Sequence, residues 1–367
     1  MSMMNESYHT IVIGGGQAGL AAGYFLAQRG ERFVILDASR QTGDSWRSRW
    51  DSLYLFTPSQ FDGLPGMRFP KPNNTFPSKD EVAEYLQDYA EKFQLPIRHG
   101  VTVEALTRAE GGYRAAVGDG AFFAGNVIIT TGAFHQPYTP SFASELGTDI
   151  LQVHSSAYRN PGQIPVQNVL VVGAGNSGVE IALELSRTGK KVWLAGRDVG
   201  SIPADTLGKP FGGRPYWWFI SRVLSLDTPL GRKVASLPNH GDPLIHNRRQ
   251  EVIQAGIECT PRISGIRSGK PQAEDGKTLP VEGVIWATGF RPDYHWIDLL
   301  VFDEHGYPRH KRGVVPEAPG LYFVGLKFQS ALNSPLLGGV GTDARYIVDQ
   351  IARSVPEMAP MAAELRG

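Results

Sequence analysis

The chain has 367 residues, 41% of them apolar, which predicts a large core and two domains rather than one. Basic and acidic residues number 36 each, so the formal net charge is zero and nothing indicates nucleic-acid binding. No apolar stretch approaches the roughly 20 residues that a membrane span needs, so we expect no membrane partner. The single cysteine, Cys259, excludes an intramolecular disulfide or a CxxC redox pair, and we expect no metal site.

The first predicted element is a strand over residues 11–13, whose β-branched apolar residues are typical of a buried parallel strand. The ten residues before it are polar and a glycine turn follows at once, so we expect no signal peptide and a cytoplasmic protein. Apolar residues at helical spacing then run to Arg29 and Gly30, and a second strand over 33–36 ends beside Asp37. The turn glycines are Gly14, Gly16 and Gly19.

A loop rich in proline, glycine, serine and asparagine is predicted for residues 57–79, followed by an amphipathic helix over residues 79–93. Ser78 is the expected N-cap of this helix, and Glu81 three residues later completes a capping-box pattern. Residues 127–132 (VIITTG) then predict a short strand that ends in a turn of small residues.

The strand-turn-helix-strand pattern of residues 10–37 recurs at residues 168–196, with the three fingerprint glycines offset by 159 positions. The second copy has its strands at 169–172 and 192–195. Residues 284–289 (VIWATG) repeat the later strand and its small-residue turn. The turn glycines of the second copy are Gly173, Gly175 and Gly178.

These patterns predict an α/β protein with two Rossmann-like dinucleotide-binding domains, the second inserted in the first. The first domain is expected to comprise residues 1–155 and 295–367. The second is expected to comprise residues 160–290.

Residues 200–250 contain several prolines and no clear period, and they predict a lid or a helical insert. Trp217 and Trp218 would either pack inside this segment or line a substrate entrance. Near the C-terminus, a glycine-containing loop over 333–339 precedes a helix for which Thr342 is the expected N-cap. The loop glycines would let the backbone approach a cofactor ring, unless the loop only caps the helix.

The two glycine turns indicate two dinucleotide sites, because such glycines permit a tight turn, the approach of backbone to a pyrophosphate and close helix packing. Asp37 stands where a carboxylate hydrogen-bonds ribose hydroxyls, which fits FAD at the first site. At the second site Gly196 and Arg197 replace that carboxylate by a guanidinium, which favours the 2′-phosphate of NADPH. NADH remains an alternative if Arg197 is only a surface residue. Because Cys259 stands alone, the electrons must pass to dioxygen, to a quinone or other small molecule, or to a redox protein.

A series of short motifs runs through the rest of the chain. Residues 43–47 (GDSWR) and 52–58 (SLYLFTP) follow the first unit, and 289–292 (GFRP) and 320–325 (GLYFVG) follow the second. In this order, together with the TTG and ATG strand ends, they resemble the flavin-containing monooxygenases and their Baeyer–Villiger relatives. The resemblance extends over roughly residues 8–352.

This resemblance implies that NAD(P)H reduces FAD and that dioxygen then adds at flavin C4a as a hydroperoxide. The adduct would oxygenate a soft nucleophile, a thioether sulfur or an amine nitrogen, and the flavin would carry the chemistry without a catalytic side chain. Three alternatives stay open: an NAD(P)H–flavin reductase that serves a quinone or redox protein, Baeyer–Villiger oxygenation of ketones, and a flavin-binding scaffold. The expected partners are a small-molecule substrate and dioxygen, with a homodimer possible.

Two positions depart from the family pattern. His154 and Tyr158 keep the spacing of the flavin-containing monooxygenase signature, but Thr148 and Ile150 stand where it has phenylalanine and glycine. We expect His154 to position backbone between the domains rather than to act in catalysis. Phe56 stands where many members have an asparagine against the oxygen adduct, and an apolar ring cannot donate a hydrogen bond to it.

The candidate pocket residues are therefore Phe56, Asn333 and Ser334, the last two as replacement donors, unless exclusion of water and bound NADP(H) protect the adduct. The cofactor-binding residues are expected at the glycine turns, at the strand ends and around Trp46. They are Gly14, Gly16, Gln17, Ala18, Gly19, Asp37, Trp46, Arg47, Thr131, Gly132, Gly173, Gly175, Asn176, Ser177, Gly178, Arg197 and Gly289.

Overall fold

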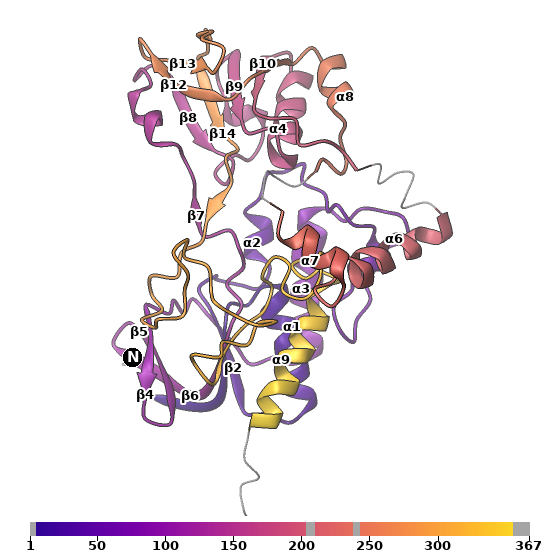
Figure 1. Ribbon diagram of the computed structural model, residues 1–367, viewed down its shortest axis with the longest axis vertical. Coiled ribbons are helices and arrows are strands. Elements are labelled where there is room, and N and C mark those ends of the chain that lie inside the picture. The colour runs from indigo at the N-terminus through magenta and orange to yellow at the C-terminus, as the bar shows by residue number, and fades with distance from the viewer. Residues whose placement is uncertain (1–4, 203–209, 238–242, 355–367) are drawn as a thin grey trace, which may run out of the picture.

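The computed structural model describes residues 5–202, 210–237 and 243–354, which form two α/β bodies joined by a narrow waist (Figure 1). One body is built on a seven-stranded sheet and the other on a five-stranded parallel sheet. All strands of the smaller sheet lie in sequence between strands of the larger one. The prediction of two Rossmann-like units, the second inserted in the first, is confirmed.

The larger sheet has the strand order β3-β2-β1-β6-β5-β4, with β16 also paired to β6. Strands β1, β2, β3, β6 and β16 are parallel, whereas β4, β5 and β6 form an antiparallel meander. The bounds are β1 Glu6–Ile13, β2 Phe33–Asp37, β3 Ile97–His99, β4 Ala105–Ala109, β5 Gly112–Val117, β6 Gly120–Ile129 and β16 Leu321–Phe323.

Three helices cover one face of the larger sheet: α1 Gln17–Gln28, α3 Lys79–Lys92 and α9 Val340–Ser354. The capping box of α3 forms as predicted, because Ser78 Oγ accepts from the Glu81 N–H and the Glu81 carboxylate accepts from the Ser78 N–H. α9 begins two residues before the expected cap at Thr342. The backbone already turns here, since the Val340 N–H donates to the Leu336 carbonyl, so Thr342 lies inside the first turn.

The smaller sheet has the order β11-β10-β9-β14-β8. Helices α4 Asn176–Arg187 and α8 Arg249–Gln254 cover one face, and the β12–β13 hairpin and a 3₁₀ turn at Ser141–Glu145 cover the other. The bounds are β8 Leu151–His154, β9 Asn168–Val172, β10 Lys191–Ala195, β11 Glu258–Thr260, β12 Ile263–Arg267, β13 Lys270–Ala273 and β14 Gly283–Trp286.

The waist contains a two-stranded antiparallel ribbon of β7 Gln136–Pro137 and β15 Phe290–Arg291 (Figure 1). The expected domain boundary at residue 155 lies beyond this ribbon, after β8. Because β8 pairs with β14, with Leu151 opposite Gly283, residues 151–154 belong to the second sheet. We propose that the boundary lies at the ribbon instead.

The described part of the expected 200–250 insert is helical, with α6 Arg214–Trp218, a π-helical turn Phe219–Val223 and α7 Pro229–Ala235. It packs on the first body, although it follows the second glycine turn in sequence. Trp217 stacks on Phe61 at a centroid distance of 4.9 Å, and Ser221 Oγ accepts from Asn333 Nδ2 at 2.9 Å. Trp217 is therefore a packing residue, whereas Trp218 is exposed; residues 203–209 and 238–242 lie outside the described residues.

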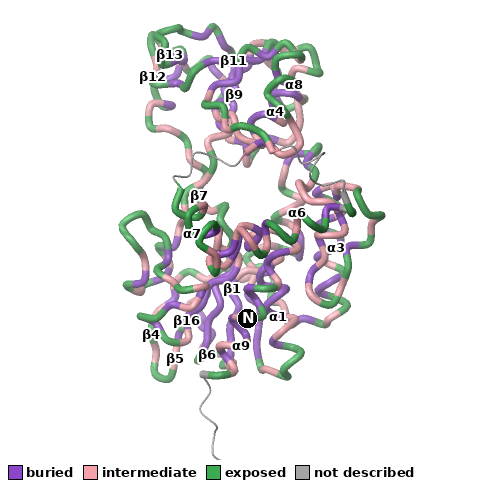
Figure 2. Tube along the Cα trace, turned by 45° about the vertical axis from the view of Figure 1, so that its right-hand side comes forward, coloured by how far each residue is buried: buried purple, intermediate pink, exposed green. Residues whose placement is uncertain are grey.

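Both sheets are buried at their centres (Figure 2). Residues 11–13 of β1 and 169–172 of β9 are buried, as their continuous apolar runs predicted. Across the described residues, no helix is both long and apolar enough to cross a membrane.

Candidate functional site

The first glycine turn joins β1 to α1 in the geometry that a pyrophosphate site requires. Gly14 has a φ of 112°, and a Cβ there would lie 2.7 Å from the carbonyl oxygen of Thr130. A Cβ on Gly19 would overlap the carbonyl oxygen of Gly14, so only glycine lets α1 pack this closely. Gly16 is the N-cap of α1, and no described atom lies within 4 Å of a Cβ built on it. The positive end of α1 therefore faces open space that fits phosphate groups.

Gln17 and Ala18 form the first turn of α1, where backbone N–H groups have no partner inside the helix. Ala18 is buried, and a Cβ on Gly325 would lie 3.1 Å from its side chain. Gly325 follows β16, so the C-terminal part of the chain returns to the first glycine turn. This contact places residues after β16 beside the expected FAD site.

Asp37 ends β2 directly beside the first turn. A Cβ on Gly15 would lie 2.5 Å from Asp37 Oδ2, and Asp37 Oδ1 accepts from the Ser39 N–H at 3.2 Å. One carboxylate oxygen is thus held by the backbone, while the other lies next to the glycine turn. This is the position from which a carboxylate can accept from a ribose hydroxyl.

The second glycine turn repeats these sterics between β9 and α4. Gly173 has a φ of 114°, and a Cβ on it would overlap the carbonyl oxygen of Ala287. A Cβ on Gly178 would overlap the carbonyl oxygen of Gly173. Gly175 is the N-cap of α4 and again has open space in front of it, with Ser177 in the first turn. Both turns therefore meet the spatial requirements of a dinucleotide.

Asn176 fastens the second turn to a distant segment. Its Nδ2 donates to the Pro243 carbonyl at 3.1 Å, and its Oδ1 accepts from the Ile245 N–H at 3.0 Å. The next residue, His246, has its Nε2 2.7 Å from the carbonyl oxygen of Leu55 in the first body. The second glycine turn is thus connected to the first body through three consecutive contacts.

Glycine and basic residues stand at the end of β10, where the first unit has Asp37. Gly196 has a φ of 151°, and a Cβ on it would lie 2.8 Å from the Ala174 nitrogen, so the position has no room for a carboxylate. Arg197 is exposed. Arg249 of α8, which no sequence motif indicates, also lies near the end of β10, because it pairs with Asp198 at 3.2 Å.

At the small-residue strand end of the first body, Thr130 holds the glycine turn, a role that the sequence did not indicate. Thr130 is buried, and its Oγ1 lies 2.8 Å from the Ile13 carbonyl and 2.7 Å from the Gly14 carbonyl, to which it donates. Thr131 and Gly132 follow on the exposed side. Their contact with a cofactor stays a prediction, whereas Thr130 visibly holds the turn.

His154 lies at the waist, as expected of a residue that positions backbone between the domains. The Ser156 N–H donates to His154 Nδ1 at 3.1 Å, so Nε2 carries the proton and donates to the Gly289 carbonyl at 3.1 Å. Burial lowers the pKa of His154, which favours this neutral form. Tyr158 donates to Glu184 at 2.7 Å and is fully buried.

Trp46 and Arg47 lie on the short helix α2 Asp44–Arg47. Trp46 packs against the cores of both bodies. Arg47 donates to the Thr42 carbonyl at 2.7 Å and to Gln87 Oε1 at 3.0 Å. Arg47 therefore ties α2 to α3, and a role toward FAD would come in addition to these contacts.

Phe56 packs against the ring of His246 at a centroid distance of 5.6 Å. The side chains proposed as replacement donors, Asn333 and Ser334, have other partners in the structure. Asn333 donates to Ser221, and Ser334 Oγ accepts from the Ser330 N–H at 3.0 Å and the Ala331 N–H at 3.1 Å. Both side chains are buried and hold the C-terminal loop.

The residue after Phe56, Thr57, contacts a buried acid that sequence reasoning missed. Thr57 Oγ1 donates to Asp62 Oδ1, and Asp62 is fully buried, with no described hydrogen-bond partner for Oδ2. Burial raises the pKa of Asp62 to about 7, against the opposing effect of the Thr57 hydrogen bond. Asp62 can therefore hold a proton at neutral pH. No motif signals this pair, because the acid lies five residues away in an irregular loop.

Comparison with known proteins identifies the family. Residues 11–206, more than half of the chain, match the family described as pyridine nucleotide-disulphide oxidoreductase. The chain belongs to that family. It is 40% identical, over 95% of its length, to 99% of a CzcO-like oxidoreductase of Geobacillus kaustophilus.

Two further relatives carry monooxygenase names. The chain is 28% identical, over 95% of its length, to 88% of the indole-3-pyruvate monooxygenase YUCCA4 of Oryza sativa subsp. japonica. A solved flavin-containing monooxygenase from Stenotrophomonas maltophilia is 28% identical and superposes with a TM-score of 0.77, over 95% of this chain and 99% of that one. The resemblance to flavin-containing monooxygenases is therefore confirmed. The protein is a flavin-dependent oxidoreductase that uses FAD and NADPH.

Proposed function

We propose that the protein is a monooxygenase that transfers one oxygen atom of dioxygen to a soft nucleophile, a thioether sulfur or an amine nitrogen. NADPH and a proton would supply the reducing equivalents, and water would be the second product. The observation that carries the proposal is the pair of open helix N-termini at Gly16 and Gly175 in a chain that has a single cysteine.

The first turn would bind FAD and the second NADPH. Asp37 would accept from the ribose hydroxyls of FAD, while Arg197, with Arg249 beside it, would bind the 2′-phosphate of NADPH. When bound, FAD supplies hydride acceptance and the activation of dioxygen. The chain supplies orientation, through Thr130 at the first turn and Asn176 at the second.

The position of Cys259 supports dioxygen over a disulfide as the electron acceptor. Cys259 is exposed on β11, at the edge of the second sheet and beside Gly196. The chain contains no second thiol with which it could form a redox pair. We therefore assign no intramolecular dithiol relay to this protein.

In this proposal the protonated Asp62 carboxyl, positioned by Thr57, would supply the donor that Phe56 lacks. The Thr57 hydroxyl donates to the Asp62 carboxyl, which holds a proton close to neutral pH. Phe56 and its neighbour His246 would exclude water, and Asn333 and Ser334 would keep the facing loop in place.

The test is oxygen-isotope incorporation. The FAD-loaded enzyme is mixed with NADPH, ¹⁸O₂ and methyl phenyl sulfide, benzyldimethylamine or a 2-oxo acid, the last because one relative is named for indole-3-pyruvate. We expect labelled sulfoxide or N-oxide in amounts that follow NADPH consumption. If all oxidised NADPH appears as hydrogen peroxide and no product carries the label, the proposal is wrong.

Phe56 favours one second candidate, an NAD(P)H–flavin reductase, because an apolar ring gives the oxygen adduct no hydrogen bond. That activity predicts NADPH oxidation stimulated by an added naphthoquinone and unaffected by methyl phenyl sulfide. Measuring both rates on one preparation separates the two functions.

A further inference from the structure

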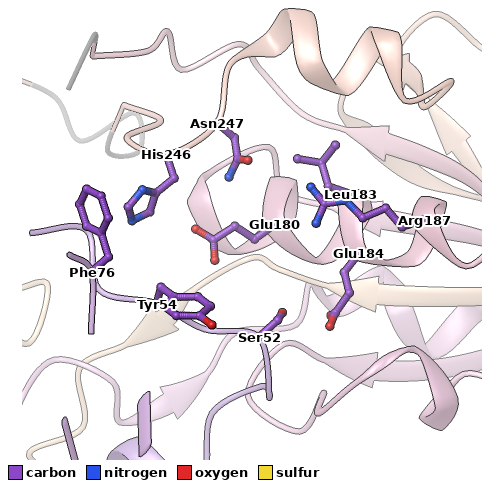
Figure 3. Close-up of a pocket in the computed structure, with 9 residues that line it drawn as sticks. All are labelled: Ser52, Tyr54, Phe76, Glu180, Leu183, Glu184, Arg187, His246 and Asn247. Atoms are coloured by element: carbon purple, nitrogen blue, oxygen red, sulfur yellow. The ribbon is translucent and has the colours of Figure 1, made fainter. Parts of the chain in front are cut away.

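A cavity of about 450 Å³ lies where α4 of the second body meets residues 52–54 and Phe76 of the first (Figure 3). Its wall contains none of the glycine-turn or strand-end residues, and neither Thr57 nor Asp62. The cavity is therefore distinct from the sites to which the proposed function assigns FAD and NADPH. It adjoins the Phe56 pocket through His246, whose ring packs against Phe56.

Two carboxylates of α4, one helical turn apart, form one wall of the cavity. Glu184 accepts from the Tyr158 hydroxyl at 2.7 Å. Glu180 differs, because its Oε1 is buried and has no hydrogen-bond partner among the described residues. Burial, and to a lesser degree the charge of Glu184, raise the pKa of Glu180 to about 7. A buried carboxylate oxygen without a partner is costly, and a cation beside it would offset that cost.

Aromatic rings face the same carboxylate. In Figure 3, Tyr54 and His246 lie on one side of the Glu180 carboxylate, and Phe76 lies beyond His246. The rings of Phe76 and His246 meet edge to face at 4.8 Å, and the Leu55 carbonyl fixes His246 through Nε2. Tyr54 is 52% exposed, so its ring remains accessible from solvent. Aromatic faces around a carboxylate are the arrangement that attracts organic ammonium ions.

Arg187 is the positive side chain in the wall, and it does not neutralise Glu180. It lies seven residues further along α4, roughly 10 Å along the helix axis. It forms no ion pair within 4 Å of Glu180 or Glu184, all three being described residues. Figure 3 places it beside Leu183, at the end of the cavity away from Phe76. Two carboxylates against one guanidinium leave the wall with a formal charge of −1 when both acids are ionised.

We propose that this cavity binds a small organic ammonium ion, with its nitrogen against Glu180 and between the rings of Tyr54 and Phe76. A metal ion fits less well, because the described residues contain no group of three or more histidine, cysteine or acidic side chains able to hold one. The carboxylates belong to the second body and the two rings to the first. The ligand would therefore bridge the two bodies and stabilise one arrangement of them.

The test uses choline and its uncharged isostere 3,3-dimethylbutan-1-ol. Binding of each to the FAD-loaded enzyme is measured by isothermal titration calorimetry. Choline should bind at least about tenfold more tightly, because only it gains the carboxylate and cation–π contacts. Its quaternary nitrogen has no lone pair to accept oxygen, so the result does not depend on the proposed monooxygenase activity. Equal affinities, or no saturable binding below about 10 mM choline, would overturn the proposal.

Matched variants locate the site. Glu180→Gln keeps the shape of the side chain and should weaken choline binding about tenfold, whereas Glu110→Gln should leave it unchanged. Glu110 is an exposed glutamate in the turn between β4 and β5 of the first body, so its substitution removes the same charge elsewhere. Tyr54→Leu, at a half-exposed position that tolerates change, should weaken binding severalfold. If Glu180→Gln binds choline as Glu110→Gln does, the cavity is not the site.

Discussion

The two glycine turns are fastened in different ways. In the first body the Thr130 hydroxyl holds the turn through the Gly14 carbonyl, whereas the equivalent residue in the second body is Ala287, which has no hydroxyl. The second turn is held by Asn176, which reaches the Pro243–Ile245 segment. The glycines themselves are dictated by close packing in both bodies. The close packing of the glycines is therefore the same in both turns. The side-chain hydrogen bonds that hold the turns in place differ.

This difference gives the two sites different mechanical surroundings. The first turn is fastened within its own body. The second turn is fastened to a segment that continues to His246, whose Nε2 meets the Leu55 carbonyl of the first body. A displacement of the second body would therefore change the contacts of its glycine turn. It would also change those of Phe56, which packs against the same histidine.

The largest expected effect is the loss of binding at one nucleotide site without loss at the other. Gly178→Ala should weaken NADPH binding about 100-fold while FAD stays bound, because the new Cβ would overlap the Gly173 carbonyl and displace α4. The FAD content is read from the flavin absorbance, and NADPH binding from the concentration dependence of flavin reduction. Gly19→Ala is the reciprocal variant and should lose FAD. Loss of FAD from Gly178→Ala would contradict the assignment of the sites.

The next effect compares an acid of each body, the buried Asp62 and the partly buried Glu180. Each has a folded-state pKa raised to about 7, so between about pH 4 and 7 the folded protein binds more protons than the unfolded chain. Stability contributed by the neutral acid is therefore present at low pH and lost as pH rises through this window. Asp62→Asn keeps an acceptor for Thr57 and should raise the free energy of unfolding at pH 8 by about 2 kcal/mol, with little change at pH 4.

Urea unfolding at both pH values, followed by tryptophan fluorescence, measures this change. Glu180→Gln is the comparison, and its effect should be smaller, because Glu180 opens into the cavity whereas Asp62 is fully buried. An unchanged pH dependence in Asp62→Asn would show that Asp62 is ionised in the folded protein.

Much of the frame could be predicted from the sequence. The repeated strand-turn-helix units follow from apolar runs and glycine spacing, and the start of α3 from the capping box at Ser78. Contacts between distant segments could not be predicted. The bond from Asn176 to Ile245 spans 69 positions, and the pairing of β8 with β14 depends on a register that no local pattern encodes.

At the strand end, sequence reasoning named Thr131 as a cofactor contact and overlooked the structural role of its neighbour Thr130. Thr130 and Thr131 are the same residue type. Successive side chains of an extended segment point to opposite sides, so only one of the two can reach the glycine turn. Which residues touch FAD and NADPH stays a prediction that the variants here test.

A moderate effect should distinguish the ends of β2 and β10. Arg197→Ala should raise the KM for NADPH about tenfold and that for NADH less than about twofold, because only NADPH has a 2′-phosphate. Arg249→Ala should raise the NADPH value about threefold, since part of its charge is already paired with Asp198. Steady-state kinetics with both cofactors measure these changes. Equal increases for the two cofactors would remove Arg197 from the phosphate site.

The smallest expected effect tests whether the first turn needs the hydrogen bonds of the Thr130 hydroxyl. Thr130→Ala should cost about 1 kcal/mol of unfolding free energy, because it removes the hydroxyl that donates to the Ile13 and Gly14 carbonyls. Thr131→Ala, at the neighbouring exposed position, should cost less than about 0.5 kcal/mol. FAD should stay bound in both, because the second body keeps the same turn with Ala287 in place of threonine. If Thr130→Ala loses FAD, the fastening matters more than the packing, and the two turns are less alike than their glycines indicate.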